Sequence, residues 1–153
     1  MPKSGRKIAR GVARNSIFVD SSAWIAFFSA RDQHHAEVDR MFHRAADEGR
    51  FLLTTNLVLA EVHRLLLYRA GTEAAAGALD RIGASALART EFPGPSQHQA
   101  ALLWLKKLRR HPISYADAVS FAVMEEVGCK TALSFDQHFR LAGFIHFGMP
   151  PNS

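Results

Sequence analysis

The sequence predicts one α/β domain with a short, mostly parallel sheet flanked by helices on both faces. Short apolar runs rich in β-branched and aromatic residues alternate with longer segments of helical periodicity, which is typical of strand–helix–strand units. Glycine, proline and N-capping residues stand at most junctions between these segments. With 153 residues, the chain is long enough to bury a sizeable core.

The first half begins with a buried strand, 16–19, whose residues Ser-Ile-Phe-Val are mostly apolar. A helical pattern follows Asp20 through Phe28, and a second helix is expected from about 34 to 47, where Gly49 stops it. The second strand is expected at 51–53. Thr54, Thr55 and Asn56 are N-cap residues for a long helix to about 70, which Gly71 ends.

The second half repeats the alternation. A helix is expected at 72–86 and a strand at 87–92, and the sequence Pro-Gly-Pro-Ser at 93–96 predicts a turn. The remaining segments are expected in the following order: helices at 97–110 and 114–127, a strand at 130–135, a helical turn at 136–142 and a last strand at 144–147. We expect residues 16–149 to form this single domain.

The net charge of +5 comes from the N-terminus. Five positive charges precede residue 15, which leaves 14 of the 19 Lys and Arg residues against all 14 acids. Residues 1–15 have few apolar side chains, so we expect a disordered basic arm. This arm could come from an upstream start, keep the chain soluble or hold RNA phosphate. The charge total alone says little about partners.

Composition excludes several classes. The one cysteine, Cys129, rules out an internal disulfide and a Cys-rich zinc site, which fits a reducing cytoplasm. No apolar run reaches the ~18 residues of a membrane span, and we expect no membrane association and no secretory signal.

Four acids stand where a charge is out of place. Asp20 and Asp136 each come directly after or at the end of a predicted strand, and Glu61 and Asp117 lie within apolar helical stretches. In open parallel sheets, ligands bind outside the carboxyl ends of the strands, so the topology delivers Asp20 and Asp136 to that edge.

The helical acids point toward apolar faces. At 100° per residue, Glu61 falls between Tyr68 and Leu65. By the same measure, Asp117 falls between Met124 and Phe121. A carboxylate that faces solvent normally lies on the side of the helix opposite such apolar residues.

Each acid also has a purely structural explanation. Ser114 and Asp117 have capping-box spacing, Asp20 and Asp136 could be N-caps, and Glu61 could pair with an arginine such as Arg64. Taken together, four such coincidences are less convincing than one shared cation. Carboxylates without cysteine or an ordered histidine set favour Mg²⁺, with Mn²⁺ as a substitute, and the implied reaction is phosphodiester hydrolysis.

The motifs that carry these acids resemble the PIN domain family, and more closely its VapC toxins. They are Ile-Phe-Val-Asp20-Ser-Ser, Thr-Thr-Asn-Leu-Val-Leu-Ala-Glu61-Val, Ser-Tyr-Ala-Asp117-Ala-Val and Leu-Ser-Phe-Asp136. The resemblance implies a three-layer sandwich and a Mg²⁺-dependent endoribonuclease in the cytoplasm of a bacterium or archaeon. It also implies a homodimer inhibited by a cognate antitoxin. Asp20 and Asp117 would be the main ligands, Glu61 and Asp136 would help activate water, and Ser134 would add a hydroxyl.

Other readings remain. The basic cluster 106–110 could grip phosphates or complement a helix C-terminus. His138 is expected to pack and hydrogen-bond behind Asp136. The alternative function is an inactive PIN-like regulatory module, although such a module would not need the acidic set. A phosphatase with Asp20 as nucleophile is disfavoured, because Ser22 stands where a second acid is needed.

Overall fold

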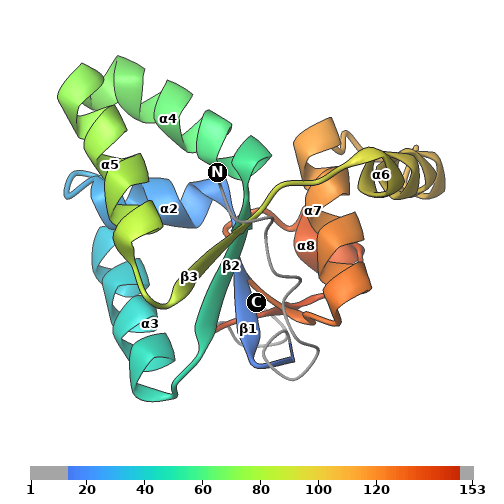
Figure 1. Ribbon diagram of the computed structural model, residues 1–153, viewed down its shortest axis with the longest axis horizontal. Helices are drawn as coiled ribbons and strands as arrows, with labels where there is room; N and C mark the ends of the chain where they lie inside the picture. Colours follow the sequence, from blue (N-terminus) through green and yellow to red (C-terminus); the bar gives the residue numbers. More distant parts are fainter. Residues whose placement is uncertain (1–13, 149–153) are drawn as a thin grey trace, which may run out of the picture.

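The computed structural model describes residues 14–148. Its centre is a five-stranded, wholly parallel sheet in the order β3-β2-β1-β4-β5, which Figure 1 shows between two groups of helices. The expected α/β architecture is therefore confirmed. The strands are β1 Ser16–Val19, β2 Phe51–Thr55, β3 Ala88–Glu91, β4 Thr131–Leu133 and β5 Ile145–His146.

Helices cover both faces of the sheet. In Figure 1, α2, α3 and α5 lie on one side, whereas α6, α7 and α8 lie on the other. The helices are α2 Ser21–Phe28, α3 His35–Asp47, α4 Asn56–Ala70, α5 Thr72–Ala84, α6 Pro95–Lys107, α7 Tyr115–Val127 and α8 His138–Leu141. In the described part of the chain, no helix has both the length and the apolar content that a bilayer crossing requires.

The sheet positions a crevice beside β1. The chain moves outward from β1 to β2 and β3, then returns to place β4 on the other side of β1. The order of strands therefore reverses between β1 and β4, and a crevice forms outside the carboxyl ends of strands at such a switch point. Asp20 follows β1 at that point, and its backbone N–H donates to the carbonyl of Leu133 at 3.1 Å.

The core is apolar on both sides of the sheet. Phe18 and Phe121 are fully buried and both contact the ring of Phe139, while Trp24 stacks with Phe28 under the other helices. Trp24 and Trp104 are also buried. Truncating a ring such as Phe121 to alanine typically costs about 3–5 kcal/mol of stability, so the strands that carry the site are firmly held.

Several predicted boundaries were wrong by two or three residues. The helix expected at 97–110 is Pro95–Lys107, because Pro95 takes the first helical position, where its missing N–H costs nothing. Gly94 is the N-cap, and its N–H donates to the Gln97 side chain at 2.9 Å. The strand expected at 130–135 ends at Leu133, and α8 begins only at His138.

The predicted N-terminal arm falls outside the described residues, apart from Arg14 and Asn15. Asn15 is attached to the domain, since its Nδ2 donates to the carbonyl of Gly49 at 3.0 Å. Its own carbonyl accepts from Nε of Arg50 at 3.0 Å. The expectation of a disordered arm therefore remains a prediction.

Candidate active site

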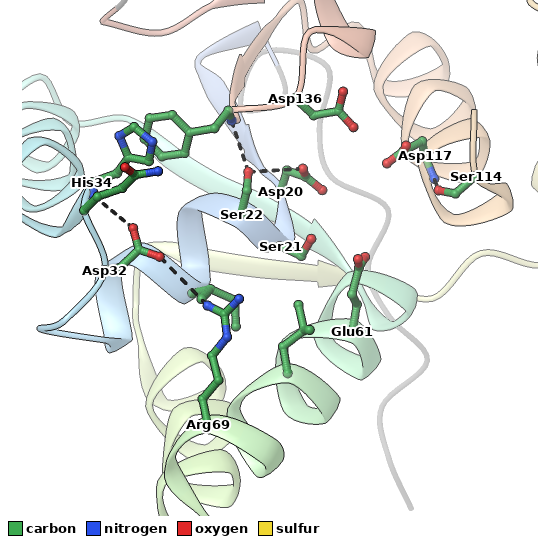
Figure 2. A pocket seen from close by; sticks show the side chains of 14 residues that line it. Asp20, Ser21, Ser22, Asp32, His34, Glu61, Arg69, Ser114, Asp117 and Asp136 are labelled. Carbon is green, nitrogen blue, oxygen red and sulfur yellow. Dashed lines mark hydrogen bonds and ion pairs between the residues drawn. The ribbon is translucent and has the colours of Figure 1, made fainter. Parts of the chain in front are cut away.

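Four acids from separate segments line one pocket at the carboxyl ends of the strands (Figure 2). Asp20 follows β1, Glu61 comes from α4, Asp117 lies in the first turn of α7, and Asp136 follows β4. These are the four positions that the sequence analysis selected. The pocket has a volume of about 500 Å³.

Asp20 lies deepest among these acids. Its exposed fraction is 5%, and Oδ2 of its carboxylate accepts hydrogen bonds from Ser134 at 3.0 Å and from Ser22 at 3.4 Å. Asp20 occupies the N-cap position of α2, but its side chain makes no capping hydrogen bond. The carboxylate is thus held in the pocket and does not serve the helix start.

Two serines tie the end of β1 to the loop after β4. Oγ of Ser22 accepts the N–H of Phe135 at 3.0 Å, and Oγ of Ser134 accepts the N–H of Asp136 at 3.0 Å. Since both hydroxyls also donate to Asp20, they fix its carboxylate relative to Asp136. Ser134 was singled out from the sequence, whereas the bridging position of Ser22 was not.

Asp117 takes part in capping and also faces the pocket. Oγ of Ser114 accepts the N–H of Asp117 at 3.0 Å, so the helix start is built as expected. The side chain is half-buried and lies in the pocket opposite Asp20 and Asp136 (Figure 2). Structural capping and a role in the pocket are therefore compatible for this residue.

The apolar stripe of α4 differs from the prediction for Glu61. The buried residues of this helix are Val58, Val62 and Leu66, whereas Tyr68 is 81% exposed. Glu61 therefore lies beside the buried stripe, at the rim of the pocket. In the described part of the chain, no ion pair joins Glu61 to Arg64 or to any other cation.

His138 lies against Asp136. Its Nδ1 is 3.0 Å from Oδ1 of Asp136, but the contact lacks hydrogen-bond geometry, so the predicted side-chain hydrogen bond is absent from the described structure. Oδ1 of Asp136 instead accepts the backbone N–H of His138 at 2.9 Å. Ligand atoms of Asp117, Asp136 and His138 all lie within 4.8 Å of one another.

The converging charges raise pKa values. Burial, followed by the charge of Asp117, raises the pKa of Asp20 to about 7, and the hydrogen bond from Ser134 only partly offsets these effects. Burial, followed by the charge of Asp136, raises the pKa of Asp117. Carboxylates that repel one another in this way are stabilised by protons or by a cation.

The donor set fits a divalent metal ion. Carboxylate oxygens dominate it, which suits a hard ion such as Mg²⁺ or Mn²⁺. A ring nitrogen of His138 lies close enough to Asp117 and Asp136 to be a further ligand, so the oxygen-only set remains a prediction. Such an acidic pocket at the switch point of a parallel α/β fold is suited to metal-assisted phosphodiester hydrolysis, which is the chemistry of metal-dependent nucleases.

Comparisons with known proteins agree with this class. The PIN domain family model matches residues 17–145, so the chain belongs to the PIN domain family. A relative from Mycobacterium tuberculosis (strain H37Rv), the 23S rRNA-specific endonuclease VapC20, is 36% identical over 129 residues. These residues cover 84% of this chain and 95% of the relative.

Two further similarities support the assignment. Ribonuclease VapC26 from the same strain is 27% identical and covers 80% of this chain and 89% of its own. The crystal structure of VapC20, described as a sarcin–ricin loop cleaving toxin, aligns with a TM-score of 0.76 over 84% of this chain and 96% of that chain. The expected resemblance to VapC ribonucleases is confirmed, and so is the enzyme class.

The pocket also contains residues that sequence reasoning missed. Asp32, Gln33 and His34, from the loop between α2 and α3, line it together with Arg69 from the last turn of α4. Their positions depend on where the loop and the end of α4 lie in space. The sequence offered only one signal, a pair of polar residues beside the two adjacent histidines at 34 and 35.

Proposed function

We propose that this ribonuclease hydrolyses RNA phosphodiester bonds with Mg²⁺ bound among Asp20, Glu61, Asp117 and Asp136, and that Mn²⁺ can substitute. The observation that carries the proposal is the convergence of these four carboxylates in one pocket, where the pKa of Asp20 rises to about 7. A fold that only binds a partner has no need to bear this repulsion.

Each residue has a distinct role in this proposal. Asp20 and Asp117 hold the ion, while Glu61 and Asp136 complete the negative set and orient the attacking water. Ser134 and Ser22 keep the Asp20 carboxylate in one orientation through their hydrogen bonds to Oδ2. When bound, the ion would lower the pKa of water and neutralise charge on the phosphate.

The proposed substrate is the sarcin–ricin loop of 23S rRNA. This assignment is carried over from VapC20, which is 36% identical to this chain along 95% of its own length. By the same analogy, the protein is the toxin of a VapBC-type pair in a bacterial or archaeal cytoplasm. It would form a homodimer and be inhibited by a cognate antitoxin protein.

The test is to replace Asp117 with asparagine, which removes a charge with little change in volume. Loss of an outer partner of a metal ligand typically costs 10- to 100-fold in metal affinity or activity, so loss of a ligand should reduce cleavage by about 100-fold or more. Cleavage of a sarcin–ricin loop hairpin would be measured with Mg²⁺ and with EDTA.

Glu125→Gln is the matched control, because Glu125 lies on the same helix but is exposed and outside this pocket. Its cleavage rate should equal that of the parent. If Asp117→Asn cleaved as fast as the parent under saturating Mg²⁺, the assigned site would be wrong. Activity in EDTA would contradict the metal requirement.

A further inference from the structure

The pocket continues beyond the four acids into an arm on the opposite side (Figure 2). We use the term pocket arm for Asp32, His34, Arg69 and Phe135, all of which line it. Arg69 and Glu61 lie on the same helix, eight residues apart, which is about 12 Å along its axis. The arm is therefore continuous with the acidic site but displaced from the acids.

Arg69 is the positive group of this arm. Five carboxylates line the pocket, and Arg69 is the only Lys or Arg among the described residues that do so. Its Nη1 is 4.0 Å from Oδ2 of Asp32, which is longer than a hydrogen bond. The ion pair thus keeps the guanidinium beside the pocket while its hydrogen-bond donors are left for a ligand.

Asp32 is itself held in place. Its exposed side-chain fraction is 19%, against 56% for Arg69, and its Oδ1 accepts the backbone N–H of His34 at 2.9 Å. Its carbonyl also accepts the N–H of His35 at 3.0 Å. The loop therefore places the partner of Arg69 and the ring of His34 on the same wall of the pocket.

The same arm offers an aromatic surface. The rings of His34 and Phe135 are stacked, with centroids 3.9 Å apart and an interplanar angle of 14°. Phe135 lies directly between Ser134 and Asp136, so the stack joins the loop at 32–34 to the acidic site. Bases of single-stranded nucleic acid stack on such aromatic side chains irrespective of sequence.

We propose that the pocket arm binds the nucleotide that flanks the cleaved bond, with Arg69 on its phosphate and the His34–Phe135 stack against its base. This inference rests on the proposed function, since it names how the same pocket holds RNA. An arginine is well suited to the task because its planar fork matches phosphate oxygens. It also offsets, at one point, the repulsion between RNA and the carboxylates.

The competing explanation is structural. Arg69 lies in the last turn of α4, where a cation favours the helix dipole, and its pair with Asp32 could serve only to hold the loop. A structural role would change the melting temperature. A phosphate contact would change the salt dependence of RNA binding, because each contact releases counterions.

The first experiment measures binding of a fluorescent single-stranded oligouridylate to the non-cleaving Asp117→Asn chain in Mg²⁺ across a range of salt concentrations. Adding Arg69→Gln should weaken binding by roughly tenfold and reduce the slope of log affinity against log salt by about 0.7, the value for one lost phosphate contact. Arg64→Gln is the matched control, because Arg64 is exposed on the same helix and does not line the pocket.

Equal slopes for all three chains would overturn the assignment of Arg69, as would the same loss from Arg64→Gln. Failure of the Asp117→Asn chain to bind the oligomer at all would also count against it, because the Arg69 contact does not need Asp117. The binding measurements test only the Arg69 contact. The proposed catalysis is tested separately, by comparing RNA cleavage by the parent with cleavage by Asp117→Asn.

The second experiment tests the aromatic surface. In the Asp117→Asn chain, His34→Ala should weaken binding of the same oligomer roughly tenfold, whereas His34→Phe should retain it, because phenylalanine also stacks on bases. The Asp117→Asn chains with and without His34→Ala should bind an oligomer of abasic ribose phosphates equally. If the alanine variant lost as much affinity for the abasic oligomer, the base contact would be refuted.

Discussion

The two ends of the central sheet differ in how their acidic side chains are neutralised. At the amino ends of β1 and β2, Glu48 lies 2.8 Å from Arg44 and 3.5 Å from Arg50, and Arg50 also donates to the carbonyl of Asn15. At the carboxyl ends, Asp20, Glu61, Asp117 and Asp136 share a pocket whose only described Lys or Arg is paired with Asp32.

The pKa values of the two ends follow this difference. The hydrogen bond from Arg44 lowers the pKa of Glu48, whereas burial and the charge of Asp117 raise that of Asp20. At the amino end, the protein supplies its own counter-charge. At the carboxyl end, the balance has to come from a proton or from an ion in solution, and this makes that end suited to binding and chemistry.

The largest effect should appear in the pH dependence of stability in EDTA. Because the folded chain holds the Asp20 proton more tightly, the associated stability is full below pH 3.8 and is lost as the pH rises to about 7. The difference between these pKa values corresponds to about 4 kcal/mol. The parent should therefore lose stability relative to Asp20→Asn over this range, as measured by urea unfolding at several pH values.

Glu48→Gln, at the other end of the sheet, should follow the pH profile of the parent over that interval. Parallel profiles for the parent and Asp20→Asn would show that Asp20 ionises normally in the folded chain. The contrast between the two ends would then be broken.

The next largest effect concerns metal ions. A ligand that binds only the folded state stabilises it by about 2.7 kcal/mol at a hundredfold excess over Kd. Mn²⁺ or Mg²⁺ should raise the melting temperature of the parent, and more at pH 8 than at pH 6, because the ligands must lose their protons. The shift should be much smaller for Asp20→Asn and unchanged for Glu48→Gln. Equal shifts in all three chains would indicate diffuse ion binding.

A smaller effect is expected from Ser134→Ala. This change removes the hydrogen bond to Asp20 and leaves the N–H of Asp136 without its acceptor. Hydrogen bonds to charged groups contribute about 1.5–3 kcal/mol, so unfolding at pH 8 should become easier by about 2 kcal/mol. Ser96→Ala is the control, because Ser96 is exposed and lies on α6. If Ser96→Ala lost as much stability, the effect of Ser134→Ala could not be assigned to its hydrogen bonds.

The smallest effect should come from Glu48→Gln. Exposed ion pairs contribute little and are screened by salt. The variant should melt close to the parent at low salt, and any difference should vanish in high salt. A large, salt-independent loss would show that the amino end depends on this charge far more than its exposure suggests.

Much of the fold was predictable because local signals agreed. The caps at Thr55 and Ser114 both receive the expected backbone N–H, and Gly71 ends its helix as predicted. The errors fell where local signals compete, as at Pro95, which is typical both of a turn and of the first position of a helix. The stripe on α4 was misjudged because periodicity cannot tell which apolar face finds a partner.

The sequence alone determined which acids were out of place, since a carboxylate within an apolar run is recognisable without coordinates. Only the tertiary structure decided that these acids share a pocket, that Ser22 and Ser134 orient Asp20, and that Arg69 faces the same cavity. The physical reason is range: capping and periodicity act within one or two turns of chain, whereas a pocket depends on how distant segments pack across the sheet.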